Sequence, residues 1–222
     1  MITATYVDHM GSDLSVVNAA RVSFGKNHTE MTEGDTRLIK YLAKYKHTSP
    51  FGHAFASFHV KAPVFVARQL VKHKFLRWNE ISRRYVDDEP EFYQPDVWRG
   101  RSEDAKQGSE GVTYPDPDIV SFYNHTALRS YNELLENGVC PEQARMLLPQ
   151  STMTEWYWSG SLDAFSDMCN LRCKEDTQYE TRLVANKIDE IMLDLYPHSW
   201  QALTKGDTHA TDPRRREHSN QT

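Results

Sequence analysis

Hydrophobic and polar positions repeat mostly at helical spacing along this chain. The clearest stripe lies at 119–136, where apolar side chains recur every three or four residues. A second long stripe, at 178–195, also predicts a helix. Shorter helices are expected at 13–24, 35–45, 63–74, 141–148 and 161–172.

Three segments, 1–9, 53–61 and 152–159, have the aromatic and β-branched content of strands. Helices outweigh strands and do not alternate regularly with them, which favours a single α+β domain, spanning 1–204, over a doubly wound fold. The segment 87–117 is rich in prolines and charges and is expected to form loops that could cover a site. Residues 205–222 contain almost nothing apolar, so we expect a polar, disordered tail.

Composition narrows the class of protein. The chain has 222 residues, 39% of them hydrophobic, and a mean hydropathy of −0.69 in the range of soluble globular proteins. No apolar run approaches the ~20 residues of a membrane span. Three cysteines and the lack of a secretory pattern predict a cytoplasmic location. A net charge of −5 argues against a general nucleic-acid or membrane-surface partner.

The densest polar stretch is 69–85, where lysines and arginines stand beside glutamine, serine and one carboxylate, Glu80. If 63–74 is one helix, Gln69, Lys72 and His73 share a face. Such donors suit phosphate groups, since guanidinium and hydroxyl groups match phosphate oxygens. The alternative is a helix end complemented by charge and followed by a solvated loop.

Trp78, Ile81 and Tyr85 are interleaved with these charges and favour a site over a purely solvated loop. No glycine-rich phosphate-binding loop occurs anywhere in the chain. Any nucleotide would therefore be held by side chains and helix ends.

Other candidates leave two interpretations open. His53 and His59 would lie on one strand face, but no paired motif supports a metal site, so we predict none. Arg172 follows the apolar stripe of a helix, and Arg145 ends a shorter one. Each is either a partner of its helix dipole or a charge presented into a pocket.

The stretch Lys72-His73-Lys74, followed after seven residues by Ser82, resembles the signature of the flavin-dependent thymidylate synthase family. That signature is Arg-His-Arg, seven residues, then Ser, within a longer Asn-Glu-x-Ser-x-Arg-Tyr run. Here both arginines are lysines, which keep the charge and lose the planar fork. Further stretches resemble the family in order, so that the resemblance covers roughly 1–203: 13–24, 47–51, 58–69, 144–149 and 170–172.

The resemblance implies a mainly antiparallel central sheet flanked by helices, in a homotetramer whose active sites each use several subunits. It implies a methyltransferase that converts dUMP to dTMP without an enzyme nucleophile. Methylenetetrahydrofolate would donate the carbon, and FAD reduced by NADPH would carry the hydride. Neither nucleic acid nor a membrane is an expected partner.

The same resemblance implies site residues by position. Arg172 would be catalytic, because a guanidinium on the N3–C4=O edge of uracil stabilises developing negative charge as an oxyanion hole does. Ser82 lacks a visible base, so it is assigned to binding. The cofactor would contact Ser49, Lys72, His73, Lys74, Glu80, Asp167 and His47, with His47 near the flavin and folate rings. The substrate would contact Gln69, Leu70, Val71, Lys72, Glu80, Ile81, Ser82, Arg83, Arg84, Arg145 and Arg172.

Two other classes remain in competition. A nucleic-acid-binding module could use 72–84 with Trp78 and Tyr85, and would show salt-dependent DNA affinity without yellow colour. A metal-dependent nucleotide phosphohydrolase could use the histidines, and would release phosphate from dUMP in a chelator-sensitive reaction.

Deleting residues 205–222 should leave folding and activity nearly intact, because the tail contributes no apolar residues to a core. Size-exclusion chromatography and turnover of the truncated chain test this. Loss of assembly on truncation would show that the tail has a structural role.

Overall fold

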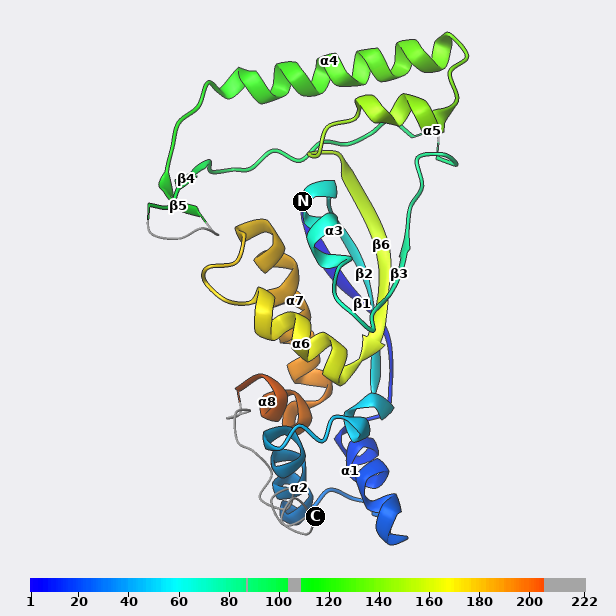
Figure 1. The fold of residues 1–222 in the computed structure, drawn as a ribbon, viewed down its shortest axis with the longest axis vertical. Helices are drawn as coiled ribbons and strands as arrows, with labels where there is room; N and C mark the ends of the chain where they lie inside the picture. Colours follow the sequence, from blue (N-terminus) through cyan, green and yellow to red (C-terminus); the bar gives the residue numbers. More distant parts are fainter. Residues whose placement is uncertain (87, 104–108, 206–222) are drawn as a thin grey trace, which may run out of the picture.

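In the computed structural model, which describes residues 1–86, 88–103 and 109–205, an antiparallel four-stranded sheet forms the centre of the molecule (Figure 1). Its strand order is β1 (Thr3–Met10), β2 (Phe55–Pro63), β6 (Met153–Ser161) and β3 (Arg77–Glu80). A separate hairpin joins β4 (Arg99–Arg101) to β5 (Ser109–Val112). The predicted α+β class with an antiparallel sheet is confirmed.

The helices are α1 (Asp13–Arg21), α2 (Glu33–Lys44), α3 (Val64–Leu70), α4 (Pro117–Glu136), α5 (Pro141–Ala144), α6 (Leu162–Arg172), α7 (Tyr179–Leu195) and α8 (Pro197–Lys205). Three short 3-10 turns, η1 (Val22–Phe24), η2 (Ser49–His53) and η3 (Arg145–Leu147), follow or link these helices. Figure 1 shows α6 and α7 on one side of the sheet, with α1, α2 and α8 gathered beyond one end and α4 and α5 beyond the other. None of the helices in the described residues is long and apolar enough to cross a membrane.

Aromatic rings join the sheet to α6. Phe58 of β2 and Trp158 of β6 are cross-strand partners, and both are fully or almost fully buried. The ring of Phe165 in α6 meets both edge to face, with centroids 5.2 Å from Phe58 and 5.5 Å from Trp158. Such geometry suits the quadrupoles of aromatic rings and adds to the burial of apolar area.

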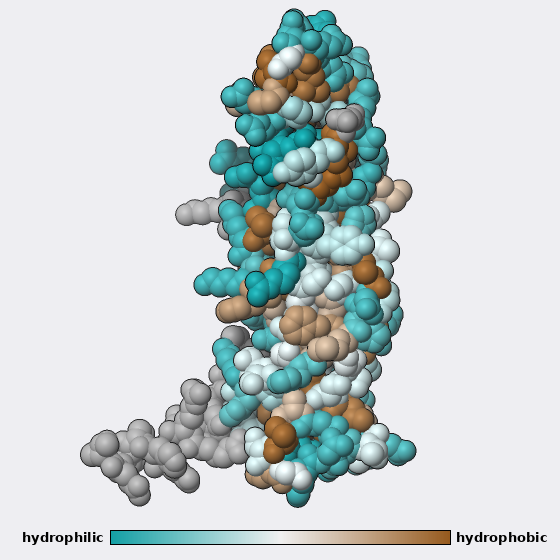
Figure 2. All heavy atoms as spheres, turned by 90° about the vertical axis from the view of Figure 1, so that its right-hand side faces the viewer, coloured by the Kyte–Doolittle hydropathy of each residue, from teal (hydrophilic) through white to brown (hydrophobic). Residues whose placement is uncertain are grey.

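The opposite face of the sheet carries polar side chains, and no helix of the described residues covers it (Figure 1). Ser57 and Ser159 hydrogen-bond across β2 and β6 at 2.8 Å, and His59 lies 3.2 Å from the carboxylate of Glu155. Tyr157 on the same face is half exposed. Figure 2 looks onto this side and shows hydrophilic and hydrophobic residues mixed along its length.

The predicted helix 63–74 is too long. α3 ends at Leu70, and the chain turns through 71–76 with Phe75 in the left-handed region at φ 64°. The spacing predicted that Gln69, Lys72 and His73 share a helix face. That prediction is wrong, because Lys72 and His73 lie on the turn after the helix. The next residues form β3, with Trp78 paired to Trp158.

Gly160 of β6 explains how this turn fits. A Cβ at Gly160 would lie 2.3 Å from Cδ2 of Leu76 and 3.3 Å from the carbonyl oxygen of Phe75. A side chain at this position would force Leu76 or the turn to shift, so glycine lets the turn pack closely on the strand. The turn 71–76 therefore packs directly against β6 at Gly160.

The C-terminal part of the chain also differs from the pattern. α8 occupies a segment for which the sequence predicted no element, and it ends at Lys205. Its first backbone amides donate to the buried carboxylate of Asp13, from His198 at 2.9 Å and Ser199 at 2.8 Å. The rest of the predicted tail, 206–222, lies outside the described residues.

A buried carboxylate ties α1 to α2. Asp35 is fully buried and accepts hydrogen bonds from Arg21, His28 and Thr32 at 2.6 to 3.0 Å. Burial raises the pKa of Asp35, but the hydrogen bonds together lower it by more. The pKa of Asp35 therefore lies well below its usual range. Asp35 thus stays ionised, and its stabilising contribution is lost only as the pH falls from its unfolded pKa toward this low folded value.

Asp35→Asn should destabilise the fold by about 3 kcal/mol, because it removes the buried carboxylate that Arg21, His28 and Thr32 share and leaves the partly exposed Arg21 without its counter-charge. Urea unfolding at pH 7 measures the change. Glu33→Gln, which removes an exposed carboxylate 3.7 Å from Arg37, is the matched control and should cost under about 0.5 kcal/mol. Equal losses in the two variants would contradict this view of the network.

Candidate active site

Two hydrogen-bonded sets of side chains lie where α3 and α6 end and α7 begins, and Thr177 just before α7 bonds the carbonyl of Leu171 in α6. One set is Arg172 with His73, and the other is Gln69 with Gln178 and Thr181; we call the two sets together the Arg172 cluster. Arg172 is the last residue of α6, and its Nε donates to Nε2 of His73 at 3.0 Å. Both side chains are only partly exposed. The hydrogen bond links the end of α6 to the turn 71–76.

The electrostatics of this pair favour a neutral histidine. Burial, and then the charge of Arg172, lower the pKa of His73 to about 4. Burial also lowers the pKa of Arg172, which remains far above neutrality. His73 can therefore accept the Nε proton at pH 7, and Arg172 keeps its two terminal amino groups for a ligand. This arrangement favours the interpretation of Arg172 as a presented charge.

The amide of Gln69 is bonded on both sides to the start of α7. Its Oε1 accepts from the hydroxyl of Thr181 at 3.1 Å, and its Nε2 donates to Oε1 of Gln178. Gln69 and Arg172 are predicted substrate residues and His73 is a predicted cofactor residue; the structure places the segments that carry them next to the start of α7. Gln178 and Thr181 were missed by the sequence interpretation, although they come soon after Arg172 in the chain.

The second group, which we call the β3 end, comprises Glu80 to Tyr85. The carboxylate of Glu80 accepts from Nε1 of Trp78 at 3.0 Å and from the hydroxyl of Thr154 at 2.7 Å. The hydroxyl of Ser82 accepts from Nε of Arg84 at 3.3 Å, and the Arg84 guanidinium lies 4.9 Å from the ring centre of Tyr85.

Main-chain bonds fix the rest of the β3 end. The amide of Ile81 donates to the carbonyl of Glu155 at 2.9 Å, and Arg83 donates to the carbonyl of Asp88 at 2.5 Å. Within the described part of the chain, no carboxylate or histidine bonds the hydroxyl of Ser82. Its predicted role in binding, rather than as a nucleophile, agrees with this geometry.

The third group lies between α2 and β2. His47 stacks on Tyr41 with ring centres 6.0 Å apart, and the exposed Ser49 begins η2. Burial and the charge of Asp163 raise the pKa of Asp167 in α6, while Lys46 lowers it. The influence of Lys46 places Asp167 close to the segment that leads into His47 and Ser49.

The structure does not bring every predicted residue together. Arg145 is exposed on η3, where its Nε donates to the carbonyl of Glu142 at 3.2 Å. Among residues 1–86, 88–103 and 109–205, no hydrogen bond or ion pair joins the Arg172 cluster to the β3 end or to Arg145. Leu70 is fully buried, so only its main chain could meet a ligand, whereas Val71 is half exposed.

Lys72 and Lys74 flank His73 on the turn 71–76. Both are exposed, and in the described residues neither ammonium group has a hydrogen bond or an ion pair. Two free cations on one turn form a donor set suited to phosphate oxygens.

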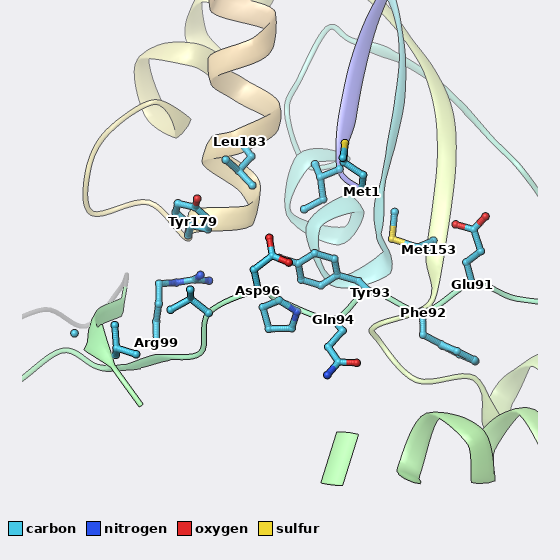
Figure 3. A pocket seen from close by; sticks show the side chains of 15 residues that line it. Met1, Glu91, Phe92, Tyr93, Gln94, Asp96, Arg99, Met153, Tyr179 and Leu183 are labelled. Atoms are coloured by element: carbon cyan, nitrogen blue, oxygen red, sulfur yellow. The ribbon is translucent and has the colours of Figure 1, made fainter. Parts of the chain in front are cut away.

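A separate cavity of about 910 Å³ lies between the N-terminus, the segment 91–99 and the start of α7 (Figure 3). Tyr93, Asp96, Arg99 and Tyr179 are among its lining residues, and no predicted site residue lines it. Beside it the buried Glu180 accepts from the hydroxyl of Tyr93 at 3.3 Å and from Arg99. No group of three His, Cys, Asp or Glu side chains in the described residues could hold a metal ion.

Comparisons with known proteins place these features in a family. Residues 5–198 match the family model described as thymidylate synthase complementing protein. A flavin-dependent thymidylate synthase from Thermus thermophilus is 41% identical over 198 residues, covering 88% of this chain and 73% of the relative. One from Thermosipho africanus is 38% identical over 204 residues, covering 90% and 89%.

Solved structures agree in fold. PolB from Streptomyces cacaoi, a UMP/dUMP methylase solved with 5-Br dUMP, superposes with a TM-score of 0.83 at 30% identity, covering 94% of this chain and 97% of PolB. The same enzyme solved with 5-Br UMP gives a TM-score of 0.80 at 30% identity, covering 92% and 94%.

Lowering the pH from 6.5 to 4 should reduce the stability of the wild type more than that of His73→Gln. The unfolded chain takes up a proton at His73 near pH 6.5, whereas the folded chain takes it up only near pH 4. The penalty is absent above pH 6.5, grows as the pH falls and is constant below 4. Urea unfolding across this range, with the exposed His125→Gln as control, measures the difference. Parallel profiles for wild type and His73→Gln would contradict the assignment.

Proposed function

Because the chain belongs to the thymidylate synthase complementing protein family, we propose that it is a flavin-dependent thymidylate synthase that methylates dUMP to dTMP. One observation carries the proposal beyond family membership. The guanidinium of Arg172 is held at Nε by a neutral His73, and the ends of α6 and α3 that carry Arg172 and Gln69 both adjoin the start of α7. A fixed cationic fork and an amide on neighbouring segments suit the carbonyl and imide edge of a uracil ring.

Arg172 acts on the N3–C4=O edge of the substrate. The terminal amino groups of Arg172 stabilise negative charge on O4 in the enolate form of uracil from which C5 attacks the carbon donor. Gln69 orients the base, while Ser82, Arg83, Arg84 and Arg145 hold the phosphate and sugar. No enzyme nucleophile takes part, in keeping with the absence of a base bonded to Ser82 in the described residues.

The residues around 72–74 fit FAD. The unpaired ammonium groups of Lys72 and Lys74, with the exposed hydroxyl of Ser49, supply donors for a diphosphate. His47, Asp167 and Glu80 complete the cofactor contacts. Bound FAD supplies the hydride, with NADPH as reductant and methylenetetrahydrofolate as the source of the carbon.

The separate placement of the predicted nucleotide-binding groups supports the assembly of several subunits around one site. In the described part of one chain, no hydrogen bond or ion pair joins the Arg172 cluster, the β3 end and Arg145, although all are assigned to one nucleotide. A homotetramer in which each site takes groups from several subunits would bring them together.

The test begins with an absorbance spectrum of the purified protein, before and after FAD and then dUMP are added. Flavin bands that shift on addition of dUMP support a shared site. Tritium release from 5-tritiated dUMP then measures turnover, with UMP as a second substrate because PolB is a UMP/dUMP methylase.

Arg172→Ala should retain FAD and lose tritium release by at least about a hundredfold, since it removes a donor to the developing oxyanion. Arg129→Ala on the exposed side of α4 is the matched control and should keep wild-type activity. Unchanged release from Arg172→Ala would remove Arg172 from the mechanism.

Failure of the wild type to bind flavin would reopen the competing functions. Phosphate release from dUMP that a chelator abolishes would then indicate the phosphohydrolase. Salt-dependent DNA affinity without yellow colour would indicate the nucleic-acid-binding module.

A further inference from the structure

The start of α7 holds the amide of Gln69 from two sides. Thr181 is fully buried, and its hydroxyl donates to Oε1 of Gln69 at 3.1 Å. Gln178, the residue before α7, accepts from Nε2 of the same amide. The two contacts are three residues apart, so one turn of helix brings both to the end of α3.

These bonds fix which way the Gln69 amide faces. An amide carries an acceptor oxygen and a donor nitrogen of similar shape, so an unrestrained glutamine can present either. Here the hydroxyl of Thr181 occupies one lone pair of Oε1, and Gln178 occupies one N–H of Nε2. One lone pair and one N–H remain for a ligand, in a defined order.

A defined donor–acceptor order matters for a pyrimidine. The edge of uracil alternates carbonyl acceptors with the N3–H donor, so a rotated amide would set donor against donor. Mismatched polar groups in a partly buried site cost more than a missing contact, since neither group can find water.

We propose that Thr181 and Gln178 are positioning residues that orient the Gln69 amide and so determine the affinity of the site for its pyrimidine nucleotide. The inference rests on the proposed function, because that function makes Gln69 a ligand of dUMP. Neither residue contacts the nucleotide: each acts through Gln69.

Thr181→Val tests the idea, since valine keeps the shape of threonine and removes only the hydroxyl. The Kd and KM for dUMP should rise about three- to tenfold, the cost of one buried hydrogen bond. The kcat and the flavin spectrum should change less than twofold. Thr181→Ser restores the hydroxyl and should recover most of the affinity.

Two controls show whether Thr181 orients Gln69 or only stabilises the fold. Thr204→Val removes a helical hydroxyl bonded to the carbonyl of Trp200, and should leave the Kd unchanged. In a Gln69→Ala background, Thr181→Val should have no further effect on dUMP binding, because nothing remains for the hydroxyl to orient. Equilibrium dialysis with labelled dUMP reads out every variant.

The outcomes separate the two proposals. If the wild type does not bind dUMP, the proposed function fails and this inference falls with it. If the wild type binds dUMP and Thr181→Val binds it equally well, only the positioning role is overturned. An affinity loss of the same size in both the wild-type and Gln69→Ala backgrounds would also overturn it.

Discussion

Contact between the tryptophans of β6 and their neighbours holds the site in place. Trp156 stacks on Trp78 of β3 with ring centres 4.3 Å apart and an interplanar angle of 18°, and Trp158 meets Phe165 of α6. One strand therefore sets both the height of β3 and the position of α6. Because Arg172 ends α6 and Glu80 ends β3, the orientation of both groups depends on this aromatic layer. Large buried rings suit such a role, since each contributes much apolar area with few rotatable bonds.

Much of the fold follows from local pattern. The stripe at 178–195 predicts α7 to within one residue, and Leu162, Phe165 and Cys169 are buried along α6 as their spacing indicates. The end of α3 could not be predicted in this way, because residues 71–76 contain neither glycine nor proline to stop a helix. The turn that follows α3 packs on Gly160 of β6, a contact with a residue distant in sequence that the local pattern cannot show. α8 was missed although Pro197 stands at a position where proline begins helices.

In the candidate site, too, the sequence predicts some features and only the folded structure shows others. The family resemblance predicts His73 and Arg172 as site residues, yet nothing in the sequence shows that one donates to the other across the domain. The spacing also predicted that Lys72 and His73 lie on the same helix as Gln69. In the structure both lie on the turn 71–76, and His73 accepts a hydrogen bond from Arg172. Thr181 and Gln178 carry no motif, since their importance arises from the meeting of α3 with α7. A residue that acts by positioning another residue can be recognised only from the contacts between them in the folded structure.

The cap that Asp13 places on α8 has a consequence for synthesis of the chain. A carboxylate near the start of the protein finds its amide partners only at His198 and Ser199, almost at the end of the described chain. Until α8 has left the ribosome, closing the core around Asp13 would bury an unpaired charge, which is strongly unfavourable. The contact between α1 and α8 therefore forms only once both segments are present, although they lie far apart in the sequence.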